Sequence, residues 1–130
     1  MSVDYAGEWL EKAEEDYWAA VSLLRQTEHP VPNAVCFHCQ QCAEKYLKAF
    51  LASRDVDIPK IHSLVTLGDM CSALDAQFGL ITPQLEQLEV YAVEFRYPGE
   101  SATQEEAYEA VEAMKQVREF VQARLGIRLH

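Results

Sequence analysis

Five polar side chains that could bind a ligand or move a proton share one face of a predicted helix: His38, Gln41, Glu44, Lys45 and Lys48. At about 100° per residue, they project opposite the three cysteines of the same segment. Imidazole, amide and ammonium groups donate hydrogen bonds to anionic ligands, and histidine carries protons near neutral pH. Such a face can line a cleft. The same residues also fit a solvated surface with routine charge pairs, which composition alone favours.

Asp16 and Arg96 lie at the edges of apolar stripes on two other predicted helices. A carboxylate at a buried edge is costly without a partner, and the Arg96 guanidinium could pair with Asp16, Glu89 or Glu44. Arg96 also directly precedes the helix-breaking residues 97–99, where it could face a groove instead. The residue types and their spacing leave the salt bridge and the groove equally open.

His62 and Trp18 stand out by their positions. His62 precedes Ser63 at the start of a predicted helix, where a histidine is either a turn residue or a proton carrier. Trp18 projects away from the apolar stripe of its helix, and an outward tryptophan favours a partner surface, such as that of a homodimer, over chance exposure.

Cys36, Cys39 and Cys42 have a spacing that invites a metal or iron–sulfur interpretation. On a helix, however, the three fall within an arc of about 120° that they share with apolar side chains. Free cysteine packs there as a small hydrophobe, and a rigid helix does not readily wrap several thiolates around one ion. We therefore expect these cysteines to be reduced, buried and free of metal.

Hydrophobic periodicity predicts five helices, over about residues 5–26, 33–53, 64–77, 83–95 and 103–125. Asn33, Ser63 and Thr82 are predicted N-caps, and Thr103 forms a capping box with Glu106. We expect the first two helices to be the longest and the third to be the weakest, since a glycine interrupts it. Outside these helices, no run of alternating apolar and polar residues is long enough to predict a β-strand. The predicted fold is all-α, a mostly up-and-down bundle of four to five helices in a single domain, residues 1–130.

The composition narrows the classes of function. The chain has 130 residues with 21 acidic and 11 basic side chains, a net charge of -10 that disfavours bulk binding of nucleic acid. No apolar run approaches the ~20 residues that span a bilayer, and the first residues show no secretory signal, so we expect a cytoplasmic protein. A glycine-rich phosphate loop, a His-Glu-x-x-His motif and a nucleophile elbow are all missing, and no cofactor is expected.

Four segments, in order, resemble motifs of the HEPN family, named for higher-eukaryote and prokaryote nucleotide-binding domains. They are Trp9-Leu10 with Ala13, Asp16, Tyr17 and Ala20 at helical spacing; His38-Cys39-Gln40-Gln41-Cys42-Ala43-Glu44-Lys45 with Leu47-Lys48-Ala49; His62-Ser63-Leu64; and Phe95-Arg96-Tyr97-Pro98. The second is the most specific, because it is similar to the family's His-x-Gln-Gln-x-x-Glu-Lys-x-x-Lys-Ala helix. The likeness covers nearly the whole chain.

The resemblance implies a helical bundle that often forms homodimers and pairs with a minimal nucleotidyltransferase, as in toxin–antitoxin systems. It also implies one groove, near the dimer axis, that could hold a nucleotide. The residues expected to converge there are Arg96, Tyr97, His62, Asp16, His38, Gln41 and Lys45. Many relatives are metal-independent ribonucleases that use an Arg followed, after four to six residues, by a His.

Two functions follow from this resemblance. Ser101, Ala102 and Thr103 occupy the positions where the histidine should follow Arg96, so the usual acid–base residue is missing. This absence and the net charge favour a binding module over an enzyme. In the alternative, the chain is a ribonuclease toxin in which His62 or His38 acts with Arg96. General acid–base help is typically worth ~10²–10⁴-fold, so a substitute histidine must be well placed.

Overall fold

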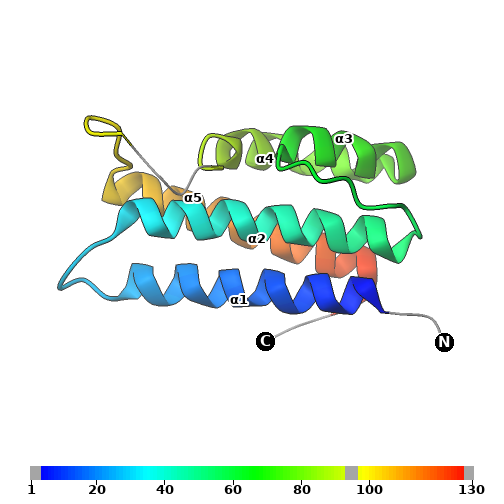
Figure 1. The fold of residues 1–130 in the computed structure, drawn as a ribbon, viewed down its shortest axis with the longest axis horizontal. Helices are drawn as coiled ribbons and strands as arrows, with labels where there is room; N and C mark the ends of the chain where they lie inside the picture. Colours follow the sequence, from blue (N-terminus) through cyan, green and yellow to red (C-terminus); the bar gives the residue numbers. More distant parts are fainter. Residues whose placement is uncertain (1–3, 93–96, 128–130) are drawn as a thin grey trace.

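In the computed structural model, which describes residues 4–92 and 97–127, the chain folds into five α-helices and one short 3-10 helix (Figure 1). They are α1 (Tyr5–Arg25), α2 (Pro32–Ser53), α3 (Leu64–Leu74), η1 (Ala76–Ile81), α4 (Thr82–Glu89) and α5 (Gln104–Leu125). No strand occurs within the described ranges. The prediction of an all-α bundle is confirmed.

Three predicted helix ends are confirmed in atomic detail. The Ser63 side chain accepts a hydrogen bond from the backbone N–H of Thr66 and caps α3. Thr103 and Glu106 form the predicted capping box at the start of α5, in which each side chain accepts from the other residue's backbone N–H. Gly126 follows α5 with φ 73°, a left-handed conformation that glycine adopts without strain.

Two predicted caps are wrong. Helix α2 begins at Pro32, one residue before Asn33, because proline suits the first helical position and Val31 takes the capping place. The Asn33 side chain makes a long-range contact instead, in which it accepts a hydrogen bond of 2.7 Å from the backbone N–H of Ala102. Thr82 is likewise the first residue of α4 and not its cap, because η1 leads directly into that helix.

Helices α3 and α4 both stop before their predicted ends. The 3-10 helix η1 follows α3, where the sequence predicted a continuous helix to residue 77. Helix α4 ends at Glu89, and tight turns follow in which Tyr91 and Ala92 donate backbone hydrogen bonds to Leu88 and Glu89. The rest of the predicted fourth helix, residues 93–95, lies outside the described residues.

Helix α2 lies in the middle of the bundle and packs against α1, α3, α4 and α5 (Figure 1). An aromatic cluster joins α2 to η1 and α5, with the ring of Phe78 4.4 Å from Phe50 and 5.0 Å from Phe120. Gly68 does not interrupt α3. A Cβ atom there would come within 2.6 Å of the Leu85 side chain, so glycine permits the close approach of α3 to α4.

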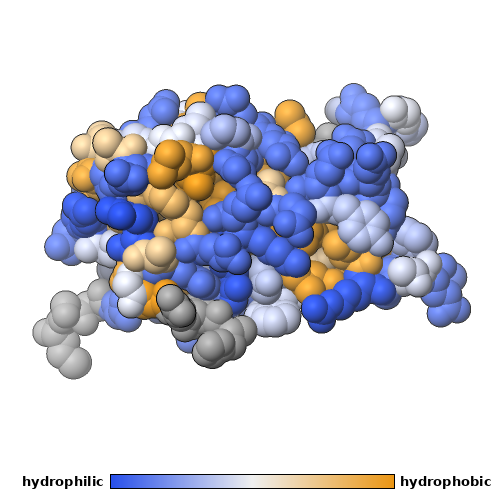
Figure 2. All heavy atoms as spheres, turned by 180° about the vertical axis from the view of Figure 1, so that it is seen from behind, coloured by the Kyte–Doolittle hydropathy of each residue, from blue (hydrophilic) through white to orange (hydrophobic). Residues whose placement is uncertain are grey.

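Helix lengths differ from the prediction. Helix α5 has 22 residues, the same as α2, while α1 has 21, so the first two helices are not the longest. None of the helices within the described residues is long and apolar enough to cross a bilayer. Hydrophilic side chains predominate on the face opposite to that of Figure 1, and apolar ones surface there in separate patches (Figure 2).

The connection between α2 and α3 decides which side chains meet. Residues 54–63 run back along α2, so that α3 begins beside the middle of α2 (Figure 1). His62 then contacts Glu44, and further along α3 the Cys71 thiol lies 3.7 Å from the backbone oxygen of Leu47. This return path brings the predicted site residue His62 to the polar face of α2.

Candidate functional site

Asp16 on α1 lies at the centre of the first group of site residues. Its carboxylate, which is 10% exposed, contacts two side chains of α2: the Nδ1 atom of His38 at 2.8 Å and the ammonium group of Lys45. The imidazole and the lysine remain partly exposed. The predicted need of Asp16 for a partner is therefore met from α2.

Glu44 on α2 is the centre of a second group. Its carboxylate, which is buried, lies 3.0 Å from the ammonium group of Lys48 and 3.1 Å from Nδ1 of His62. Gln40 donates its side-chain N–H to Glu44 and to the backbone oxygen of His62, both at 3.3 Å. The Lys48 ammonium also lies 5.3 Å from the centre of the Trp9 ring, in the range of a cation–π contact.

Gln41 joins the neighbouring α2 side chains into one polar face. It donates a hydrogen bond of 2.7 Å to the side-chain oxygen of Gln40, which in turn bonds Glu44. The interpretation of this face as a solvated surface holds only in part. Glu44 and Lys48 are buried, as is the neighbouring Gln40, whereas His38, Gln41 and Lys45 are partly exposed. Buried polar groups must be paired to be tolerated, and α1 and the segment before α3 supply the cover. Gln40 is a member that the site prediction missed, although the Gln-Gln pair marks it in the sequence.

Glu89 fixes the segment that carries His62. Its carboxylate, at the end of α4, accepts hydrogen bonds from the Ser63 hydroxyl and the backbone N–H groups of Leu64 and Val65, at 3.2, 3.2 and 2.7 Å. Both N–H groups belong to the first turn of α3, where a negative charge is favourable. Glu89 therefore partners the start of α3.

The remaining predicted site residues are placed differently. Arg96 lies outside the described residues, so its predicted contact with Asp16, Glu89 or Glu44 stays a prediction. Tyr97 is described and its side chain is exposed. The structure thus brings Asp16, His38, Gln41, Lys45 and His62 to one face of α2.

A hollow of about 440 Å³ opens beside His38. Its lining residues are Pro30, Val31, Pro32, Asn33, Ala34, Phe37 and His38. The Phe37 ring lies 5.8 Å from the imidazole in an edge-on arrangement. An apolar, partly aromatic wall next to a histidine can accept a flat ring whose polar end lies at the imidazole.

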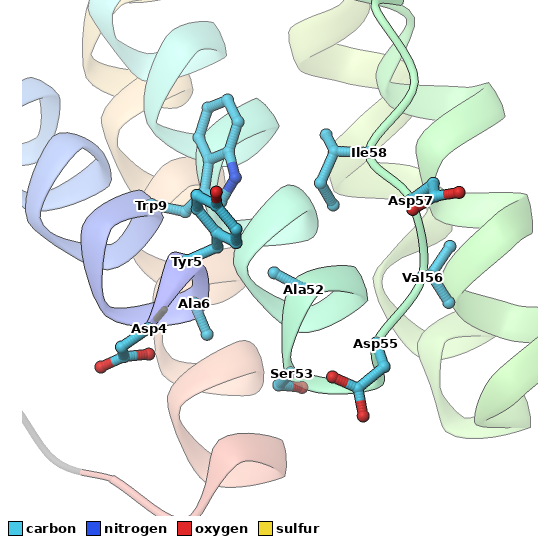
Figure 3. Close-up of a pocket in the computed structure, with 10 residues that line it drawn as sticks. All are labelled: Asp4, Tyr5, Ala6, Trp9, Ala52, Ser53, Asp55, Val56, Asp57 and Ile58. Carbon is cyan, nitrogen blue, oxygen red and sulfur yellow. The ribbon is translucent and has the colours of Figure 1, made fainter. Parts of the chain in front are cut away.

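A larger hollow of about 770 Å³ lies between the start of α1 and the end of α2. Figure 3 shows the rings of Tyr5 and Trp9 on one side and Ile58 on the other, while the carboxylates of Asp4 and Asp55 point away from the rings. The Asp4 carboxylate is engaged as the cap of α1, where it accepts from a backbone N–H. Because its charged groups do not converge, this hollow is a poorer candidate for a binding site.

The cysteines pack as predicted. Cys36, Cys39, Cys42 and Cys71 are thiols buried in the core, and none of them forms a disulfide within the described ranges. Burial raises the pKa of Cys71 to about 12 and the pKa of Cys39 further still, so both thiols are neutral near pH 7. Among the described residues no group of three His, Cys, Asp or Glu is placed to hold a metal ion. That the cysteines bind no metal stays a prediction, which elemental analysis of the purified protein would test.

The arrangement suits an anionic ligand. Each buried carboxylate holds one histidine at Nδ1, so the second ring nitrogen, Nε2, is the one that can meet a ligand. Each carboxylate is also neutralised by one lysine, so that protonation of an imidazole adds net positive charge to the face. A donor-rich face of this kind contrasts with the rest of a chain whose net charge is -10.

Comparison with known proteins agrees with this architecture. The family model of the HEPN domain matches residues 6–124. The chain belongs to the HEPN family. The residues that form the two carboxylate-centred groups all lie inside the matched range.

Two solved structures share the HEPN fold of this chain. TT1696 from Thermus thermophilus is 24% identical, with a TM-score of 0.72 over 93% of this chain and 98% of its own. ST0689, described as an archaeal HEPN homologue, is 22% identical, with a TM-score of 0.74 over 94% of this chain and 98% of its own. No curated protein matches the chain. At these identities the likeness establishes the fold alone.

Proposed function

We propose that this HEPN domain is a binding module that holds a nucleotide at the polar face of α2 and acts with a minimal nucleotidyltransferase. The observation that carries the proposal is the pair of buried carboxylates, Asp16 and Glu44, each of which positions one histidine and one lysine. The partner follows from the family resemblance, as does a homodimer in a toxin–antitoxin type of pair. The proposed domain spans residues 1–130 and acts in the cytoplasm.

The chemistry of a nucleotide matches the two parts of the site. A phosphate needs hydrogen-bond donors, and Gln41 and Lys45 provide them. His38 and His62 hold a carboxylate at Nδ1, so each donates to a phosphate through Nε2 in its protonated form. A base needs a flat apolar surface, and the hollow walled by Phe37 lies beside His38. In the proposed pose the base lies against Phe37 and the phosphates lie toward the imidazoles.

Calorimetric titration with ATP, GTP, CTP, UTP and inorganic triphosphate tests the nucleotide site. We expect one or more nucleotides to bind, and His38→Ala and His62→Ala each to weaken binding by at least tenfold at near-normal thermal stability. His29→Ala is the control for the loss of a histidine, because His29 is exposed in the loop before α2 and, among the described contacts, binds neither Asp16 nor Glu44. Failure of all five probes to bind, or equal weakening by His29→Ala, would refute the nucleotide site.

Co-expression with a minimal nucleotidyltransferase encoded beside this chain tests the partnership. We expect the two proteins to co-purify in a defined ratio and the HEPN chain alone to sediment as a homodimer. A concentration-independent monomer, or a neighbour that never co-purifies, would contradict the corresponding part of the proposal.

A ribonuclease is the second candidate, and one observation favours it. Both His38 and His62 contact a buried carboxylate through Nδ1, which is how a carboxylate orients a general acid or base. An assay of RNA cleavage in the presence of EDTA distinguishes the ribonuclease from the binding module. The proteins compared are wild type, His38→Ala, His62→Ala, Arg96→Ala and His29→Ala. We expect wild type to cleave no faster than Arg96→Ala. Robust cleavage that is lost in His62→Ala and Arg96→Ala would establish the ribonuclease.

A further inference from the structure

An apolar groove follows the outer side of α1, away from the polar face of α2. Its volume is about 810 Å³, and its lining residues are Leu10, Glu11, Glu14, Glu15, Trp18 and Ile127, which we call the Trp18 groove. At helical spacing, Trp18 projects about 160° away from Asp16, so α1 presents the groove and the nucleotide face on opposite sides. A function of this groove is therefore independent of the proposed nucleotide site.

Trp18 is held in place while a large part of it faces solvent. Its side chain is 43% exposed, and its ring packs edge-on against Tyr17 at 5.0 Å. Tyr17 is in turn fixed by the guanidinium of Arg118, which lies 3.9 Å from the centre of its ring. An exposed, oriented tryptophan beside two aliphatic side chains has the composition of an interface hot spot.

The charges around the groove indicate which class of molecule could bind there. Glu14 is neutralised by Arg118, whose two bonds to its carboxylate are both 2.8 Å long. Glu11 and Glu15 are exposed, and within the described residues neither forms an ion pair. The groove therefore presents an apolar floor with two free negative charges.

Repulsion between like charges disfavours several occupants of the groove. A second copy docked through the same groove would bring Glu11 and Glu15 close to their own counterparts, in a molecule whose net charge is already -10. Nucleic acid and anionic membrane surfaces carry the same sign of charge as the groove. A protein segment with an apolar side chain between lysines or arginines matches both the floor and the charges.

We propose that the Trp18 groove binds a basic amphipathic helix of a partner protein. An apolar side chain of that helix packs on Trp18 and Leu10, while lysine or arginine side chains one turn away pair with Glu11 and Glu15. This proposal gives a binding role to the exposed Trp18, which lies outside the proposed nucleotide site.

Fluorescence anisotropy with two labelled peptides of about 18 residues, five helical turns each, tests this proposal. One peptide is an amphipathic helix of leucine and lysine, and the other has glutamate in place of every lysine. We expect the intact protein to bind the lysine peptide, to bind the glutamate peptide at least tenfold more weakly, and to lose affinity as salt is raised.

Variants test whether the lysine peptide binds in the Trp18 groove. We expect Trp18→Ser and the double variant Glu11→Lys/Glu15→Lys each to weaken binding of the lysine peptide at least tenfold. The matched control is Glu105→Lys/Glu109→Lys, an exposed pair on α5 with the same spacing and the same change of net charge. Thermal unfolding of every variant confirms that it is folded.

Three results would overturn the proposal. Equal weakening by the α5 control would mean that the peptide follows net charge alone. Unchanged binding in Trp18→Ser would mean that the apolar floor plays no part. A wild-type dimer that Trp18→Ser converts to a monomer in analytical ultracentrifugation would mean that a second copy covers the groove.

Discussion

Two polar regions flank α1, and they use carboxylates that are buried or partly buried in opposite ways. On one side, Glu14 accepts two hydrogen bonds from Arg118 and a third from the Tyr46 hydroxyl, which itself accepts one from Gln122. On the other side, Asp16 and the neighbouring Glu44 hold the histidines and lysines of the candidate site. The first region is closed on itself, whereas the second leaves donors at the surface.

The two regions differ in how far the partners of their carboxylates are exposed to solvent. The side chains of Glu14 and Arg118 are 17% and 10% exposed, and together they join α1 to α5. The carboxylate of Glu44 is buried more deeply, yet the His62 side chain that it contacts is 73% exposed. A buried acid is therefore no sign of function by itself. What distinguishes a site is whether the partners of the acid can still reach a ligand.

The pKa values follow the same contrast. Burial alone would raise the pKa of Glu14, but the hydrogen bonds from Arg118 and Tyr46 outweigh burial and hold that pKa below the ordinary value of 4.5. Burial, together with the bond to Glu14, raises the pKa of Tyr46. At neutral pH the closed region thus consists of a carboxylate, a guanidinium and a neutral phenol, a set that favours stability.

Removal of Arg118 breaks the closed region and has the largest expected effect. Arg118→Ala leaves Glu14 partly buried without its bidentate partner, and we expect a loss of about 3 kcal/mol in the free energy of unfolding, measured in urea. The double variant Glu14→Leu/Arg118→Met should recover most of the loss, because it leaves no unpaired charge. A loss below about 0.5 kcal/mol in Arg118→Ala would show that the pair is only a surface salt bridge.

Acid should weaken the closed region that contains Glu14. Because the pKa of Glu14 is lower in the folded than in the unfolded chain, its carboxylate contributes stability that is fully present above about pH 4.5. That contribution is lost as the pH falls through the lowered folded value. Thermal unfolding of wild type and Glu14→Gln between about pH 7 and pH 3 measures it, and the difference between the two proteins should shrink toward the acid end. A constant difference would contradict the lowered pKa.

Glu89→Ala tests the same comparison at the segment that carries His62. It removes three hydrogen bonds at the start of α3, two of them from backbone N–H groups, and we expect a loss of about 1–2 kcal/mol in the free energy of unfolding. Nucleotide binding should also fall, because the segment that carries His62 is released. Glu86→Ala, an exposed position one turn earlier, is the matched control and should change neither quantity.

His62→Ala should have the smallest effect on stability. A side chain that is mostly exposed contributes little to folding, so we expect a change within about 0.5 kcal/mol, measured by urea unfolding. The Glu44 carboxylate keeps Lys48 and Gln40 as partners in this variant. A loss comparable to that of Arg118→Ala would place His62 with the structural residues and remove it from the candidate site.

The periodicity of the chain predicts most of the fold. Apolar stripes and the caps at Ser63, Thr103 and Gly126 locate the helices, since these signals depend on residues within a turn or two of one another. The misplaced start of α2 has a tertiary cause beside the local preference of Pro32 for the first helical position. Asn33 is bound to the backbone of Ala102, far away in the sequence, and no local pattern announces such a contact.

Helical periodicity is enough to assign side chains to helix faces: the buried cysteines on one side of α2, the polar side chains on the other, and Trp18 outside the core. The contacts that those faces make depend on the tertiary packing. The path of residues 54–63 brings His62 to Glu44, and the packing of α1 gives Asp16 to His38 and Lys45 but Glu14 to Arg118. Helical spacing is a local property, whereas the partner of a buried charge depends on the packing of segments distant in the chain.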